Sequence, residues 1–177
     1  AKFENSTYWS NHTKIDPESH AAMIWIGSVV PANQSFRTGV RGLTVSAYEA
    51  SKKHRDKRIS CISSTGYVEE NSIVEDVCLN GFSGFGIGFN NGFGVSTVNG
   101  LSLRNFWITA AMHRDAVGIY IPHHAGVASI RDGTIDCRVG KASLPEKDWP
   151  NYGMVVSGAH TSIDNVHIEG CGIGIYI

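Results

Sequence analysis

The chain has 177 residues with 15 basic and 16 acidic side chains, so its formal net charge is −1. This balance argues against a nucleic-acid-binding protein, which usually carries a basic excess or a basic stripe. No apolar run approaches the roughly 20 residues that a transmembrane helix needs, so a membrane partner is not expected. Glycine is abundant, with 20 residues, and many short Val and Ile runs accompany it, which favours an all-β chain rich in turns.

The first 22 residues are polar and show neither a basic start nor an apolar leader run, so we predict a lead-in segment at residues 1–22. The first short apolar element is MIWI, which begins at Met23. A repeating pattern follows this element and continues to the last residue, Ile177. We therefore predict a single domain at residues 23–177.

A seven-residue pattern recurs along that domain: any residue, apolar, any residue, Gly/Asn/Asp, apolar or Gly, any residue, apolar. The copies are GVRGLTV, IVEDVCL, TVNGLSL, SIRDGTI and SIDNVHI, which begin at Gly39, Ile73, Thr97, Ser129 and Ser162. Gly, Asn and Asp tolerate a left-handed backbone best, so each copy predicts a strand, a bend and a second strand. The predicted bend residues are Gly42, Asp76, Gly100, Asp132 and Asn165.

A second element follows each copy and often starts with glycine. Its clear members are GIGF at Gly86, GIYI at Gly118, GMVV at Gly153 and GIYI at Gly174, with RISCI at Arg58 as a weaker member. Three short strands per turn are typical of a parallel β-solenoid, whose rungs stack about 4.8 Å apart. We therefore predict about five to six coils. An antiparallel β-sandwich is the alternative, although it does not require the same bend residue at the same offset.

The pattern resembles the right-handed parallel β-helix of the pectate-lyase-like superfamily, which includes polysaccharide lyases, polysaccharide hydrolases and phage tailspikes. The resemblance covers residues 23–177 and implies a tight turn at the bend column and a sugar-binding cleft beside the first sheet. Resemblance to tailspikes also implies a homotrimer and an extracellular or virion-surface location. Because GIGIYI ends the chain as an interior rung with an unpaired edge, we expect the chain to be a fragment of a longer solenoid.

Loops between the repeat and the second element differ in length, and this difference predicts a groove. They are long at residues 46–57, 104–117 and 136–152, and short at residues 80–85 and 169–171. Stacked rungs bring equivalent loops to one edge, where functional residues often gather. Long walls around the short second loop would therefore leave a groove over the second coil.

Aromatic side chains near this groove suit a carbohydrate ligand, because flat rings pack against sugars and Tyr and Trp add a polar group. The alternative is that the rings cover the solenoid or meet a partner subunit. Outward positions of the second element are expected at Trp25, Ser60, Gly88, Tyr120, Val155 and Tyr176, with Trp107 and Trp149 in the walls. The substrate-binding candidates are Tyr120, Trp107, Trp149, Tyr176, Arg55 and Arg138.

Two loops carry the letters HRD, at residues 54–56 and again at residues 113–115. A histidine titrates near neutral pH, an arginine can clamp a uronate carboxylate, and an aspartate can act as a base. His113, Arg114 and Asp115 are therefore catalytic candidates. The alternative is a solvated, charged loop tip.

Asp136 and Glu169 form a second catalytic candidate, because each directly follows the last apolar residue of its repeat. On successive rungs they would lie about 5 Å apart, close to the separation of about 5–5.5 Å in retaining glycosidases. The resemblance, however, implies catalytic groups on the first sheet, and that row holds no carboxylate. Neither the Asp-Asp and Gly-His-Gly set of polygalacturonases nor the calcium-binding acids of pectate lyases is found.

Two functional hypotheses remain open. The first is a carbohydrate-active domain that binds an extended polysaccharide and cleaves it by lyase or hydrolase chemistry. The second is a structural or adhesive element of a phage appendage or cell-surface protein. No cofactor or metal is expected: Cys61, Cys78, Cys137 and Cys171 lack zinc-binding spacing and are expected to be small buried hydrophobic residues.

Overall fold

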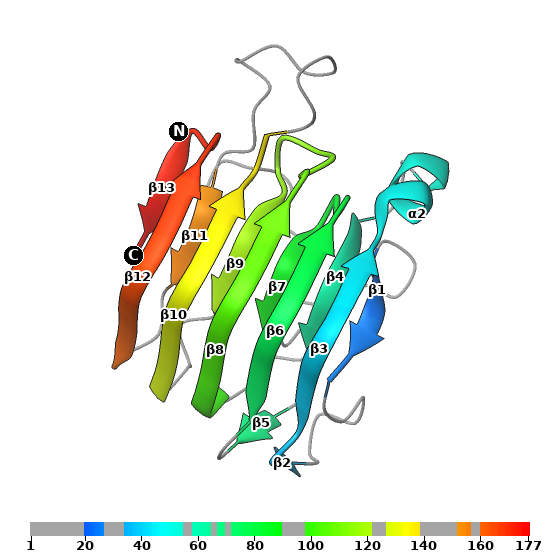
Figure 1. Cartoon of the computed structure of the whole chain (residues 1–177). Coiled ribbons are helices and arrows are strands. Elements are labelled where there is room, and N and C mark those ends of the chain that lie inside the picture. The colour runs from blue at the N-terminus through cyan, green and yellow to red at the C-terminus, as the bar shows by residue number, and fades with distance from the viewer. Residues whose placement is uncertain are drawn as a thin grey trace.

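The computed structural model describes residues 20–26, 34–54, 58–64, 67–69, 72–89, 98–121, 127–138, 152–156 and 160–177. Within this part of the chain the fold is all-β and consists of two parallel sheets (Figure 1). The first strand begins at His20, inside the predicted lead-in segment. No helix in the described part of the chain is long and apolar enough to cross a membrane.

The first sheet collects the elements predicted to follow each repeat, together with the apolar element at Met23 that precedes the first repeat. Its strands, in spatial order, are β1 (His20–Trp25), β4 (Arg58–Ser64), β7 (Phe85–Phe89), β9 (Val117–Ile121), β11 (Tyr152–Val156) and β13 (Ile173–Tyr176). Each strand pairs in parallel with the next one in this order. Spatial order therefore equals chain order throughout this sheet.

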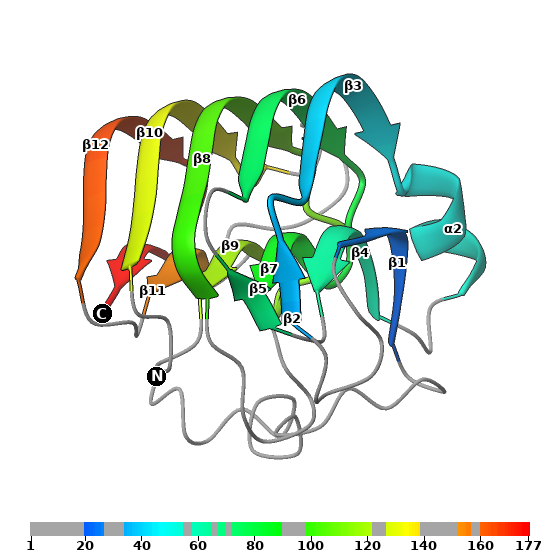
Figure 2. The same cartoon turned by 90° about the horizontal axis from the view of Figure 1, so that it is seen from below.

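The second sheet collects the repeats themselves. Its long strands are β3 (Gly39–Ser46), β6 (Ile73–Asn80), β8 (Val98–Thr109), β10 (Val127–Asp136) and β12 (Thr161–Glu169), again parallel and in chain order. The short strands β2 (Gln34–Phe36) and β5 (Tyr67–Glu69) add to the same sheet beside the start of β8. A short helix, α2 (Tyr48–Lys53), lies at the β1–β3 end of the stack (Figure 2).

The strands of the second sheet bend sharply at one column of residues, which Figure 2 shows as a row of arches. Residues on either side of the bend pair in register from β3 through β12, so the bends stack directly on one another. The bend residues have left-handed φ angles: Gly42 65°, Asp76 55°, Asn105 48°, Asp132 54° and Asn165 49°. The predicted bends at four of these positions are confirmed.

The predicted third bend, Gly100, is wrong. Although its φ is 71°, the registered pairs Glu75–Arg104 and Val77–Phe106 place Asn105 opposite Asp76. The third repeat is therefore SLRNFWI at residues 102–108, and residues 104–109 are strand, not the predicted loop. Only residues 110–116 connect β8 to β9, so the long wall predicted at residues 104–117 is absent.

Inward-facing apolar residues from both halves of each repeat build the core between the sheets. Leu103 and Ile108 of β8, like Ile130 and Ile135 of β10, are fully buried. Burying a side chain of this size contributes about 1.5–3 kcal/mol. Because equivalent positions stack on neighbouring strands, the same burial of apolar side chains recurs along the core.

A column of glycines explains why the second element begins with Gly. A Cβ atom on Gly118 would lie 2.6 Å from the carbonyl oxygen of Gly153 and 2.7 Å from Cγ2 of Ile135. The same approach recurs at Gly86 against Ile108 and at Gly153 against Ile168. The last apolar residue of the third, fourth and fifth repeats therefore occupies the space that a side chain at these glycines would need.

Candidate functional site

A groove of about 800 Å³ runs along the outer surface of the bends of the second sheet. It is lined by the bend residue and the two residues after it in β3, β6, β8 and β10, and by Asn165 and His167 of β12. Its position differs from the predicted groove, which lay at the loop edge over the second coil. The groove crosses five stacked strands, so its long direction follows the stacking direction of the sheet.

Trp107 is an exposed large hydrophobic residue in this groove, with 59% of the residue exposed. It lies on β8, where it pairs with Cys78 of β6 on one side and Thr134 of β10 on the other. The same row continues to Thr44 and His167 at the two ends. Trp107 was predicted to stand in a loop wall, whereas a strand fixes its backbone.

The floor of the groove beside Trp107 is formed by an aromatic ring packed over a glycine. Phe106 is only 4% exposed, and a Cβ atom on its partner Gly133 would lie 2.2 Å from the Phe106 ring. The missing side chain at Gly133 thus leaves room for the ring. No side chain therefore projects from Gly133, the residue that pairs with Phe106 beside Trp107.

Amides and carboxylates alternate along the bend column. The Asn165 side-chain amide donates a 2.9 Å hydrogen bond to Oδ1 of Asp132. The Asn105 amide donates in the same way to Oδ1 of Asp76. Each of these bonds uses one oxygen of the carboxylate, and a carboxylate can accept further hydrogen bonds through its other oxygen.

Arginines one position before the bend are already paired with acidic residues. Glu75 accepts Arg104 at 2.6 Å and Arg41 at 3.3 Å. Arg131 lies 4.0 Å from Asp132, the bend residue that follows it. Each of these three arginines therefore has an acidic neighbour within the protein, and Arg41 and Arg104 share one.

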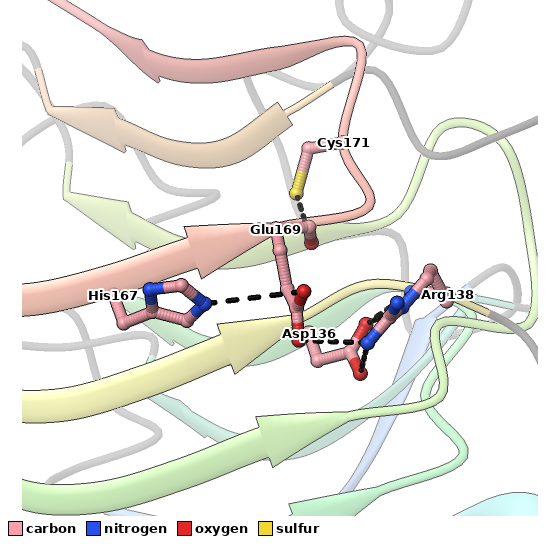
Figure 3. Close-up of polar contacts among 5 residues, drawn as sticks. All are labelled: Asp136, Arg138, His167, Glu169 and Cys171. Carbon is pink, nitrogen blue, oxygen red and sulfur yellow. Dashed lines mark hydrogen bonds and ion pairs between the residues drawn. The ribbon is translucent and has the colours of Figure 1, made fainter.

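The predicted pair Asp136 and Glu169 is brought together, because the two residues are registered partners on β10 and β12. Arg138 lies between them and binds both (Figure 3). Its Nε and Nη2 donate to Asp136 at 2.8 and 2.7 Å, and Nη2 also donates to Oε1 of Glu169 at 2.7 Å. These hydrogen bonds lower the pKa of Asp136 below its usual value of 3.8.

This arrangement opposes acid–base chemistry at the pair. A retaining glycosidase needs one of its two carboxyl groups in the protonated form to donate a proton to the leaving group. Asp136 is stabilised as an anion, and the guanidinium of Arg138 occupies the space between both carboxylates. His167 adds a contact from Nε2 to Oε2 of Glu169 at 3.9 Å. The cluster acts as an ionic clasp between neighbouring strands.

The HRD segment at residues 113–115 forms a turn between β8 and β9. Nδ1 of His113 accepts a 3.1 Å hydrogen bond from the backbone N–H of Asp115, so this nitrogen carries no proton. Arg114 and Arg58 approach the Asp115 carboxylate at 3.6 and 4.0 Å. Burial and the nearby Arg58 lower the pKa of His113, which favours the neutral imidazole. Since Arg58 belongs to β4, the turn is tied to the first sheet.

Aromatic candidates on the first sheet are packed against other rings. Tyr120 stacks on Phe85 with ring centroids 5.1 Å apart, and burial raises its pKa. Tyr176 meets Tyr152 edge-on at 5.6 Å. Val155, between Tyr120 and Tyr176 in the same row, is 0% exposed. This row therefore offers no continuous open surface.

One member of that row differs from the prediction. Ser63, not Ser60, pairs with both Trp25 and Gly88. Ser60 lies three positions earlier on β4, where it pairs with Ala22, and its hydroxyl accepts the backbone N–H of Phe85 at 3.0 Å.

Two predicted binding residues, Arg55 and Trp149, lie outside the described residues. The groove adds residues that sequence reasoning did not select: the four bend side chains from Asp76 to Asn165, together with Thr134 and His167. Alignment of SLRNFWI with SIRDGTI would have placed Trp107 beside Thr134. In the described part of the chain, no group of three or more His, Cys, Asp or Glu residues is placed to hold a metal ion.

Comparisons with protein families, with curated proteins and with solved structures give no match to this chain. Function is therefore inferred from the groove, its exposed ring and its polar lining.

Proposed function

We propose that the two parallel sheets are faces of a right-handed β-helix and that its outer groove binds an extended polysaccharide. The alternation of the chain between the sheets supports the coil, as does the register of the bends from β3 to β12. The resemblance to the pectate-lyase-like superfamily points the same way. A virion or cell surface as location, and a trimeric assembly, belong to the same proposal.

The exposed ring of Trp107 is the observation that carries the binding proposal. An indole offers a flat apolar face for a sugar ring and one N–H donor for a hydroxyl group. Trp107 stands in the middle of a row that runs from Thr44 to His167 across neighbouring strands. Strands are spaced about 4.8 Å apart, comparable to the length of one sugar ring, so successive sugars would meet equivalent positions on successive strands.

The ionic clasp favours binding without cleavage. Arg138 holds Asp136 as an anion and bridges it to Glu169. In the turn at residues 113–115, Nδ1 of His113 accepts the backbone N–H of Asp115, and the Asp115 carboxylate lies 3.6 Å from the same nitrogen. We therefore favour an adhesive, glycan-binding role over lyase or hydrolase chemistry, consistent with a surface or appendage element.

The test is binding of a polysaccharide panel by affinity electrophoresis, with Trp107→Ala compared with Trp25→Ala. Trp25 is the matched control because it is exposed, at 40%, but lies on the first sheet. Trp107→Ala should weaken binding at least tenfold, whereas Trp25→Ala should bind as the parent does. Release of reducing ends and unsaturated uronides should stay at background. Equal binding by Trp107→Ala, or no bound polymer in the panel, would overturn the proposal.

A further inference from the structure

We infer that the groove selects neutral, hydroxyl-rich polysaccharides over polyuronates; this inference rests on the proposed glycan-binding function. The chemistry of the groove lining carries it. In the described lining there is no lysine or arginine, and two carboxylates stand on either side of Trp107, Asp76 on β6 and Asp132 on β10. An incoming sugar therefore meets fixed negative charge next to the ring on which it stacks.

The bend column presents mainly hydrogen-bond acceptors to a ligand. Each carboxylate accepts only, and one oxygen of each is already bonded to a neighbouring amide. The amides of Asn105 and Asn165 each commit one N–H to this pairing. The side-chain atoms of the bend column that are left for a ligand therefore include more hydrogen-bond acceptors than donors. Sugar hydroxyl groups can donate to such acceptors, whereas a uronate carboxylate cannot.

Neighbouring cations do not offset this bias. Arg41 and Arg104 share Glu75. Arg131 lies closest to Asp132, itself a groove carboxylate. Arg138 is bound to Asp136 and Glu169 at the strand ends. Each of these arginines therefore already has an acidic partner in the protein, with which a uronate would have to compete.

The experiment uses an array of neutral hexasaccharides of glucose, mannose and galactose, each printed beside its C6-oxidised uronate form. Because each pair shares one backbone, any difference within a pair reports the replacement of the C6 hydroxyl group by a charged carboxylate. Binding that depends on Trp107 should be at least tenfold weaker for the uronate form. In Asp76→Asn/Asp132→Asn, which keeps the shape and one acceptor oxygen per residue but removes both negative charges, this ratio should shrink.

A measurement on the unmodified protein guards against misfolding of the double variant. Repulsion between exposed charges is screened by salt, so the preference for the neutral form should fall as ionic strength rises. Equal or tighter Trp107-dependent binding of a uronate form would overturn the selectivity but leave glycan binding standing. If no sugar in either form binds through Trp107, both the selectivity and the proposed function fail.

Discussion

The side-chain amide of Asn165 donates a 2.9 Å hydrogen bond to Oδ1 of Asp132, which occupies the same bend position on the neighbouring strand. Asn105 and Asp76 repeat the relationship on β8 and β6. Each pair joins two residues with a left-handed φ. Asn and Asp tolerate this conformation better than most residues, and their side chains also link adjacent bends through hydrogen bonds. The groove follows this column of linked bends.

Replacing Asn165 should separate the backbone role from the hydrogen bond. Asn165→Ala should destabilise the fold by about 1–2 kcal/mol, because alanine tolerates the left-handed φ poorly. Asn165→Gly loses the same hydrogen bond but relieves the backbone, so its loss should be smaller. Urea unfolding measures both variants. Identical free energies of unfolding for Ala and Gly would show that the bend conformation is not what Asn165 provides.

Replacement of glycine by alanine in the glycine column should be tolerated only where the added Cβ atom has free space. Gly118→Ala would place Cβ 2.6 Å from a backbone carbonyl oxygen that cannot move independently of its strand. Overpacking of this kind costs about 1–3 kcal/mol. Gly174→Ala is the control, because no heavy atom lies within 4 Å of its added Cβ. Thermal melts should show a clear loss for Gly118→Ala alone, and equal melts would refute the packing explanation.

Arg138→Gln should raise the pKa of Asp136, since the hydrogen bond from Arg138 is the largest cause of its lowered value. The folded-state pKa lies below the usual 3.8, so this interaction stabilises the fold above that pH. The stabilisation is lost as pH falls through the folded pKa. Carboxyl carbon NMR titration gives the pKa directly. The melting difference between parent and variant should therefore be larger at pH 7 than at pH 3, and a pH-independent difference would contradict this.

Thiol reactivity should differ between two cysteines of the core. Burial raises the pKa of Cys61 to about 12, so its thiolate is scarce at pH 8. A hydrogen bond from Cys137 lowers the pKa of Cys171 below 9.0, and the thiolate is the reactive form. Iodoacetamide at pH 8 should label Cys171 well before Cys61, as followed by peptide mass spectrometry. Faster labelling of Cys61 in the folded protein would contradict the packing around both residues.

The bends at Gly42, Asp76, Asp132 and Asn165 were predictable because a left-handed φ restricts which residues can occupy the position. The third bend was missed because β8 offers two overlapping solutions. Gly100 also has a positive φ, and Leu101 and Leu103 supply the expected apolar positions. Pairing with the neighbouring strands identifies Asn105 as the bend residue. A seven-residue sequence pattern does not show which residues of neighbouring strands pair.

The candidate site was predictable only in part. Trp107 was selected as an aromatic side chain, but its place in the groove depends on the corrected register of β8. Tyr120 was correctly placed in the outward row with Gly88 and Val155, yet facing outward did not make that row accessible. Alternation tells which face a residue takes, whereas burial depends on what packs on that face.

The most direct test of the account is a map of the binding surface by NMR, using the neutral hexasaccharide that binds best on the array. Backbone amide and indole shifts should change most at Thr44, Cys78, Trp107, Thr134 and His167, the row that lines the groove. Shifts concentrated at Tyr120 and Tyr176 on the first sheet, with the Trp107 indole unchanged, would contradict it.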